Sequence, residues 1–187
     1  IVAASKEYDG ATYATVSNAG ATFAGMVNGD VLNVSATSAN FIDKNAGSDK
    51  AVNVSELTLS GSAMGNYSLA ATAIGTAEIT QRALNLAFAG ANKVYDGGTA
   101  ASLTITDNRI ANDVLTATAS GAFADKNAGS NKVVTVQNAS LSGTDAANYV
   151  LASTTGATSA TITQRELALG FAAAGKTYDG NTVATLA

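Results

Sequence analysis

One sequence pattern recurs along the chain with a period of about 83 residues. The stretch FIDKNAGSDKAVNV, which begins at Phe41, returns as FADKNAGSNKVVTV 82 residues later. The stretch ITQRALNLAF, which begins at Ile79, returns as ITQRELALGF after 83 residues. Several landmarks in the same order indicate a tandem array of similar units rather than one large domain.

The period divides the chain into three segments. Residues 1–82 are repeat one, residues 83–165 are repeat two, and residues 166–187 open a third repeat. Position 1 corresponds to Phe88, so the first strand of repeat one is truncated and we interpret the chain as a window on a longer array. Repeat one also carries four additional residues within 17–30, which predicts a surface loop there.

Hydrophobic periodicity within a unit predicts strands. Leu84, Leu86 and Phe88 alternate with smaller or polar residues, as expected for a strand with one buried face. After Val52 and Val54 the apolar residues change parity, and repeat two has the same change. This pattern predicts a β-bulge or short break near 55–56 and again near 137–138.

Many Thr and Val residues, with turns rich in Asn, Asp and Gly, favour pleated strands. Adding strands around Thr12, Leu32 and Ile79 gives about six per unit, with a short helical turn at 145–147. The predicted fold class is all-β, with small β-sandwich or β-grasp-like domains in tandem. Because nothing resembling a flexible linker separates the units, we expect them to form a linear rod.

Charge and composition exclude several classes of function. The net charge is −4, and the ten Lys and Arg residues are scattered, so neither nucleic acid nor an anionic membrane is an expected partner. The chain has no Cys and no His, which removes the thiol nucleophile, the commonest general base and the commonest metal ligands. No apolar run approaches the length of a membrane helix. We therefore expect no enzyme, no catalytic residue and no bound cofactor.

A Tyr-Asp-Gly step occurs three times, and we interpret it as a structural turn. Glycine adopts positive φ at low cost, and aspartate can accept a hydrogen bond from its own backbone two residues on. Sugar stacking or a catalytic Tyr–Asp pair is the alternative, but a repeat array needs the same turn in each unit. The nine residues of this motif are Tyr8, Asp9, Gly10, Tyr95, Asp96, Gly97, Tyr178, Asp179 and Gly180.

The Asp-Lys-Asn-Ala-Gly motif at 43–47 and 125–129 also predicts a polar turn. A Lys–Asn isopeptide bond to a distant residue is the sharper alternative, and it would need an apolar setting that shifts the pKa of the lysine. Calcium is a further alternative, because loop carboxylates are suitable ligands. The candidate ligands are Asp9, Asp30, Asp43 and Asp49.

The boundary between units is expected to be rigid. The sequence ITQR runs directly into the first strand of the next unit at both boundaries. Our hypothesis is that Arg82 and Arg165 bridge to the backbone or to acids of the following unit.

The motifs Tyr-Asp-Gly, Asp-Lys-Asn-Ala-Gly, Leu-Ser-Gly with Asn-Tyr, and Ile-Thr-Gln-Arg, in this order, resemble the YDG-domain repeats of large secreted bacterial adhesins. These include filamentous-haemagglutinin-like proteins, and the repeats are similar to MBG-type extracellular modules. The chain departs from related modules in having no proline, with Gln81 and Gln164 where proline often follows the Ile-Thr step. The resemblance implies tandem β-domains in a stalk or fibre at the bacterial cell surface.

The expected function is thus that of a structural extender in cell adhesion or biofilm, whose partners are neighbouring repeats and an unidentified receptor. Two alternatives stay open. One is a glycan- or protein-binding module that uses the loop from Asn18 to Asn28. The other is a filament in which an open sheet edge accepts a strand from a like chain.

Overall fold

The computed structural model describes residues 1–19 and 21–185, and within them the regular structure is all-β apart from two short 3₁₀ turns, as the sequence predicts. Repeat one is built on a four-stranded sheet in the order β2-β6-β5-β4, and a separate pair joins β1 to β3. Its strands are β1 (Val2–Ala3), β2 (Lys6–Glu7), β3 (Val16–Ser17), β4 (Asn33–Phe41), β5 (Gly47–Ser60) and β6 (Thr72–Thr80).

Repeat two has a five-stranded sheet in the order β10-β12-β13-β15-β9. A separate two-stranded sheet pairs β11 with β8. Strand β15 also contacts β8, so the two sheets enclose apolar side chains between them. The strands are β7 (Arg82–Leu84), β8 (Leu86–Gly90), β9 (Lys93–Val94), β10 (Ala100–Ala101), β11 (Leu103–Asp107), β12 (Thr116–Phe123), β13 (Gly129–Ser142), β14 (Tyr149–Leu151) and β15 (Gly156–Thr163).

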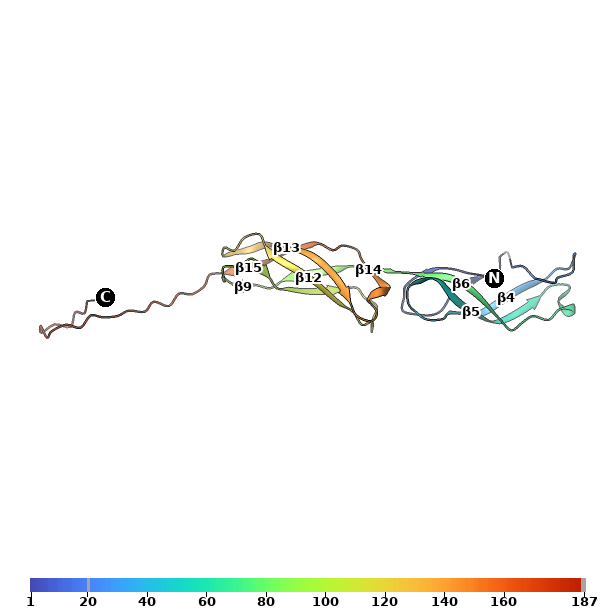
Figure 1. Ribbon diagram of the computed structural model, residues 1–187, viewed down its shortest axis with the longest axis horizontal. Helices are drawn as coiled ribbons and strands as arrows, with labels where there is room; N and C mark the ends of the chain where they lie inside the picture. Colours follow the sequence, from blue (N-terminus) through green and yellow to red (C-terminus); the bar gives the residue numbers. More distant parts are fainter. Residues whose placement is uncertain (20, 186–187) are drawn as a thin grey trace.

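The last strand of repeat one continues directly into repeat two. Strand β6 ends at Thr80 and β7 begins at Arg82, so only Gln81 separates them. Figure 1 shows β4, β5 and β6 gathered towards the N-terminal end of the molecule and β12, β13 and β15 in the middle, with residues 164–185 leading away as an extended segment. The curled sheets of the two repeats therefore meet where β6 passes into β7.

The inward-facing positions of the long strands β5 and β13 change parity midway, so that Val52, Val54 and Leu57 of β5 all pack into the same core. Val134 and Val136 are fully buried, and Asn138 then takes a positive φ of 56°. The pairing of β12 with β13 shifts at this point, so the predicted β-bulge near 137–138 is confirmed. In repeat one, Glu56 has a φ of 55°, but the register of β4 against β5 is the same on both sides. There the two paired strands change parity together, because the buried residues of β4 also change parity, from Val34 to Ala39 and Phe41.

Other local predictions have mixed outcomes. The helical turn predicted at 145–147 is confirmed as the 3₁₀ turn η2 (Ala146–Asn148), and repeat one has a counterpart in η1 (Met64–Asn66). Ile79 lies in β6, but β4 begins one residue after Leu32. Near Thr12 the predicted strand is reduced to an isolated bridge between Tyr13 and Asn40.

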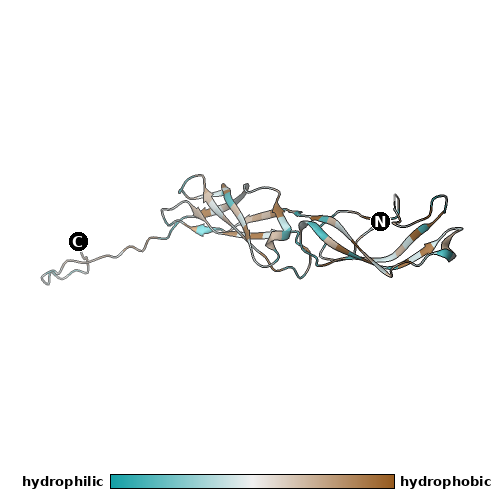
Figure 2. Ribbon diagram, turned by 45° about the vertical axis from the view of Figure 1, so that its right-hand side comes forward, coloured by the Kyte–Doolittle hydropathy of each residue, from teal (hydrophilic) through white to brown (hydrophobic). Residues whose placement is uncertain are grey.

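Burial follows the alternation seen in the sequence, and Figure 2 shows hydrophobic and hydrophilic residues alternating along the strands of both repeats. The fully buried side chains include Val52 in repeat one and Ile162 in repeat two. Among the described residues, no helix has the length and apolar character needed to cross a membrane. The insertion at 17–30 follows β3 as irregular chain; Gly20 lies outside the described residues, so this part of the predicted binding loop from Asn18 to Asn28 is not described.

Candidate functional site

All three Tyr-Asp-Gly steps have the same local geometry. In the first, Asp9 Oδ1 accepts hydrogen bonds from the backbone N–H of Ala11 and from Lys6 Nζ. The same two bonds are made by Asp96 and by Asp179, each with the lysine three residues before it. The central glycines have φ of 77°, 82° and 71°. The motif is therefore an aspartate-bonded turn closed by a lysine, formed from local residues alone.

The tyrosines of the three turns have different surroundings. Tyr8 is fully buried, Tyr95 is partly buried, and Tyr178 is 94% exposed. The Tyr8 hydroxyl donates to Asp113 Oδ2 at 2.8 Å, and Asp113 belongs to repeat two. The first turn thus reaches across the junction between the repeats.

Asp113 is the centre of this junction. Its Oδ2 accepts a second hydrogen bond, 2.6 Å long, from the hydroxyl of Tyr149. That hydroxyl in turn accepts from the backbone N–H of Ile110 at 2.9 Å. The other carboxylate oxygen, Oδ1, lies 2.8 Å from Lys44 Nζ of repeat one. Both oxygens of the buried Asp113 carboxylate therefore have hydrogen-bond or ion-pair partners, as a buried charge requires.

Lys44 pairs with two carboxylates of repeat two. Its Nζ lies 2.8 Å from Asp113 and 3.0 Å from Asp145 Oδ1. The remaining oxygen of Asp145 accepts from the backbone N–H of Val114 at 2.8 Å, which holds the carboxylate in place. Repeat one thus supplies the cation and repeat two supplies both anions.

A second set of hydrogen bonds joins the Asp-Lys-Asn-Ala-Gly turn to the 3₁₀ turn η2. The side-chain oxygen of Asn148 accepts from the backbone N–H of Ala46 at 2.9 Å. Its amide nitrogen donates to Asn45 Oδ1 at 3.2 Å. Asn148 is 2% exposed, so these contacts across the junction satisfy a polar group that water cannot reach. Next to them, Gln81 Nε2 donates to the carbonyl oxygen of Ala147 at 2.9 Å.

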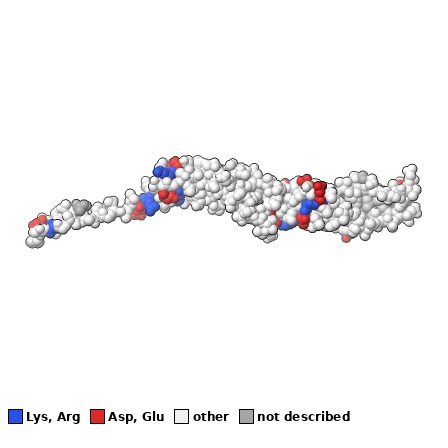
Figure 3. Space-filling model, viewed as in Figure 1, with Lys and Arg blue, Asp and Glu red and all other residues white. Residues whose placement is uncertain are grey.

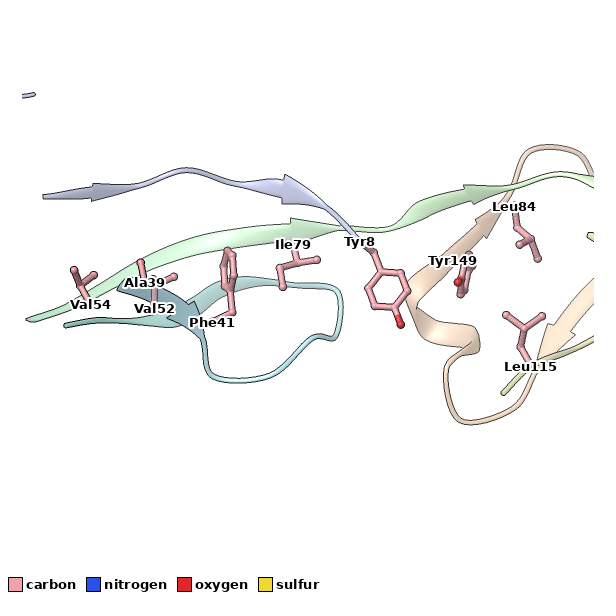
Figure 4. Close-up of a cluster of buried hydrophobic side chains, with 9 residues drawn as sticks. All are labelled: Tyr8, Ala39, Phe41, Val52, Val54, Ile79, Leu84, Leu115 and Tyr149. Carbon is pink, nitrogen blue, oxygen red and sulfur yellow. The ribbon is translucent and has the colours of Figure 1, made fainter. Parts of the chain in front are cut away.

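Apolar side chains from both repeats pack around the hydrogen bonds. Figure 4 shows one buried cluster that runs from Val54 and Phe41 of repeat one to Leu84 and Leu115 of repeat two. The rings of Tyr8 and Tyr149 meet edge to face at its centre, with centroids 5.4 Å apart and an interplanar angle of 76°. The two repeats therefore share one continuous hydrophobic core.

The network shifts the pKa values of its members in a consistent way. Burial and the hydrogen bond to Asp113 raise the pKa of Tyr149 to about 12, and the same two causes raise the pKa of Tyr8. Burial alone would raise the pKa of Asp113, but the bonds from Lys44, Tyr149 and Tyr8 lower it below its usual value. Hydrogen bonds to Asp113 and Asp145 raise the pKa of Lys44. At neutral pH the site therefore holds an ammonium group, two carboxylates and two neutral phenols.

The two arginines assigned to the boundaries lie there, but the expected partner of Arg82 is wrong. Its guanidinium lies 3.4 Å from Glu7, which belongs to repeat one, and this pair is largely exposed. What Arg82 contributes to the following unit is backbone pairing, because β7 runs parallel to β14 with Arg82 opposite Tyr149. Arg165 is exposed and no ion pair is formed by it within the described residues.

The other candidate chemistries of the sequence are not assembled. No group of three or more acidic residues that could hold a metal ion occurs within 1–19 and 21–185. Asp9 and Asp43 each bind a lysine, and Asp30 accepts from Tyr67. The raised pKa of Lys44 keeps its amine protonated, which opposes the nucleophilic attack that an isopeptide bond requires.

The sequence motifs do not mark Asp113, Asp145 or Asn148 as functional residues, although a signal exists for Asp113 and Asn148. Asp30 and Asp113 stand 83 residues apart, and the Asn-Tyr pairs at 66–67 and 148–149 stand 82 apart. Polar residues that recur at the period of the array are candidates for contacts between units. In the space-filling view (Figure 3), charged residues gather at the junction and at the far end of repeat two, and much of the surface between is uncharged.

A comparison with protein-family models finds the YDG domain twice, over residues 1–74 and 80–156. No curated protein and no solved structure shows a match to the chain.

Proposed function

Because the chain belongs to the YDG-domain family, with two copies over most of its length, we propose that it is a structural extender of a bacterial extracellular adhesin or surface fibre. In this function the chain catalyses nothing and binds no cofactor. Each unit adds length and holds its neighbour at a fixed angle. A stalk of such units presents a binding region located elsewhere.

The observation that carries this proposal is that residues of the repeated sequence motifs form the junction. Tyr8, Lys44 and Asn45 come from the motifs that define the repeat, and all three bind repeat two. A junction made from the repeating motifs can be formed again at every boundary of an array. That property is what an extender needs and a single binding site does not.

The continuity of the strand supports the same proposal. With one residue between β6 and β7, and β7 paired to β14, the chain has no free linker at the boundary. A shared core and a buried charge network on either side of that strand resist bending. Units joined in this way stack into a linear rod of small β-sandwich-like domains, in which stability is partly shared between neighbours.

The proposal is tested on cells that produce the protein. Antibodies raised against residues 1–163 label surface fibres in immunogold electron microscopy, and removal of one internal 83-residue unit shortens each fibre by one unit length. A variant that lacks a different part of the secreted protein is the control, because it shows whether a deletion of this size blocks secretion by itself. Label confined to the cell interior, or fibres of unchanged length, would contradict the extender function.

A further inference from the structure

An early strand and the last strand of each repeat are paired in parallel. In repeat two, β9 and β15 align Lys93 with Ile162 and Val94 with Thr163. In repeat one, β2 and β6 pair in the equivalent register. Because the two strands of a pair run in the same direction, the chain enters the pair at one end and leaves it at the other. Tension along the chain therefore pulls the two strands in opposite directions along their common axis.

The path of the chain through repeat two keeps tension on this axis. Figure 1 shows the chain passing from β6 into repeat two along the long axis of the molecule, and β15 ending at the opposite end of that repeat. Strand β15 is an interior strand of its sheet, with β13 on one side and β9 on the other. Tension on β15 thus loads the hydrogen bonds on both of its sides together, in shear, instead of opening them one after another.

Three further hydrogen bonds close the parallel pair of repeat two. The backbone N–H of Tyr95 donates to the carbonyl oxygen of Thr163 at 2.9 Å. The hydroxyl of Thr163 donates to the carbonyl oxygen of Lys93 at 3.4 Å. The side-chain oxygen of Asn92 accepts from the backbone N–H of Thr161 at 2.7 Å. The equivalent residues of repeat one make the same three bonds, at 2.9, 3.4 and 3.0 Å.

The third of these bonds is kept although the residue that makes it differs between the repeats. Ser5 stands at the position of Asn92, and its hydroxyl accepts from the backbone N–H of Glu78. A hydroxyl and an amide differ in length and shape, yet both supply an acceptor to the same backbone position of the last strand. The bond therefore belongs to the design of the repeat.

A lysine fastens the first strand of the pair to the rest of the unit. Lys93 Nζ bonds Asp96 at 2.8 Å and the carbonyl oxygens of Gly98 and Ala100 at 2.9 and 3.1 Å. It also lies 5.5 Å from the centroid of the buried Phe123 ring, within the range of a cation–π attraction. The lysine of repeat one lies 5.6 Å from the equivalent ring. Each lysine thus ties its strand to chain that tension does not pull directly.

We propose that each repeat is a force-bearing unit, and that its parallel strand pair is a clamp that resists tension along the chain. The clamp consists of residues 92–96 and 161–163 in repeat two, and of residues 5–9 and 78–80 in repeat one. Its bonds are loaded together and must break nearly together, which slows unfolding under force. The proposal rests on the extender function for its use in the cell, because a stalk transmits the force between a surface and a binding region. It also gives the lysine and aspartate of the repeated turn a mechanical role.

Unfolding of the 187-residue chain in optical tweezers tests the effect of direction. The chain has no cysteine, so pairs of introduced cysteines decide where the handles attach. Asn85→Cys with Gln164→Cys places the handles at opposite ends of repeat two, whereas Thr99→Cys with Gln164→Cys places both at the end where β15 leaves. At equal force the first pair is expected to unfold at least about tenfold more slowly, because two or more hydrogen bonds must break together. Equal or faster unfolding of the first pair would overturn the proposal.

Two substitutions, pulled from opposite ends of repeat two, test the bonds of the clamp. Asn92→Ala removes the acceptor for Thr161, and Lys93→Met keeps the length of the side chain but removes its charge. Each is expected to raise the unfolding rate at fixed force at least about fivefold, the change that corresponds to one hydrogen bond. The matched control is Lys126→Met, which should unfold like the unchanged chain. Lys126 is exposed and forms no ion pair or side-chain hydrogen bond within 1–19 and 21–185.

Circular dichroism without load shows whether each variant is folded, and the comparison of handle positions decides the proposal even where a variant is not. Folded variants that unfold under load at the rate of the unchanged chain would contradict the clamp. The outcome is separate from that of the fibre experiment. Weak resistance in a chain that labels surface fibres would remove the clamp and leave the extender function, whereas strong resistance in a chain confined to the cell interior would do the opposite.

Discussion

The same leucine of the repeat is fully buried at one boundary and almost fully exposed at the other. Leu84 has no exposed surface and lies between β14 and Leu115, whereas Leu167 is 85% exposed. The tyrosines of the Tyr-Asp-Gly turns differ in the same way, from Tyr8 with no exposure to Tyr178 with 94%. The local turn is identical in each case, so the difference comes from the neighbouring unit alone. The Tyr-Asp-Gly turn thus forms from local residues alone, whereas burial of its tyrosine requires the adjacent repeat.

The largest effect is expected from truncating Leu84. Leu84→Ala should lower the free energy of unfolding by about 2–5 kcal/mol, because it leaves a cavity in the shared core. Leu167→Ala should change it by less than about 0.5 kcal/mol, since that side chain is exposed. Urea unfolding followed by circular dichroism at low micromolar concentration measures both. Equal effects would mean that the exposed strand is packed in solution.

Removing the central carboxylate comes next. Asp113→Ala leaves two buried phenols without their acceptor and leaves Lys44 paired with Asp145 alone, and it should cost about 2–3 kcal/mol. Its counterpart Asp30 binds only Tyr67, at the surface, so Asp30→Ala should cost under about 1 kcal/mol. The same unfolding measurement applies. A smaller cost for Asp113→Ala than for Asp30→Ala would contradict the central position of Asp113.

The pH dependence of stability should show a plateau with two edges. The pKa of Asp113 is lowered in the folded state, so its contribution is complete above the unfolded value of about 3.9 and is lost as pH falls below it. The pKa of Tyr149 is raised to about 12, and those of Tyr8 and Lys44 are raised. Their contribution is complete below pH of about 10 and is lost as pH rises further. Thermal unfolding from pH 3 to 11 measures both edges, and Asp113→Ala should flatten them.

Much of this architecture follows from the sequence. The period, the all-β class, the turns of Tyr-Asp-Gly and the bulge at Asn138 depend on residues close together in the chain, whose geometry is fixed locally. The contact between Tyr8 and Asp113 joins residues 105 positions apart in two different units, so no local sequence pattern predicts it. The partner of Arg82 was misjudged for a related reason. Strand β2 pairs in parallel with β6, and this pairing places Glu7 opposite Thr80 at the end of β6, where the side chain of Arg82 reaches it.

A smaller effect is expected from removing one hydroxyl. Tyr8→Phe keeps the ring against Tyr149 and loses only the bond to Asp113, which should cost about 1 kcal/mol. Tyr95→Phe, in the corresponding turn of repeat two, should cost nothing measurable, because the Tyr95 hydroxyl forms no hydrogen bond within residues 1–19 and 21–185. The difference between the two variants in urea unfolding reports the hydrogen bond across the junction, and its absence would show that the bond is not made.

The smallest effect is expected from Arg82→Ala. Its ion pair with Glu7 is exposed and lies within repeat one, and such pairs contribute about 0–1 kcal/mol. Small-angle scattering should give the same maximum dimension as the unchanged chain. A clear loss of rigidity in Arg82→Ala would contradict this prediction and would mean that the Arg82 side chain helps to fix the junction.

The central claim is that the junction fixes the two repeats relative to each other, and residual dipolar couplings measured by NMR test it directly. Couplings from repeat one and repeat two in weakly aligned solution should fit one common alignment tensor, and Asp113→Ala should separate them into two. Two independent tensors in the unchanged chain would mean that the repeats move freely, and the account of a rigid extender would fail.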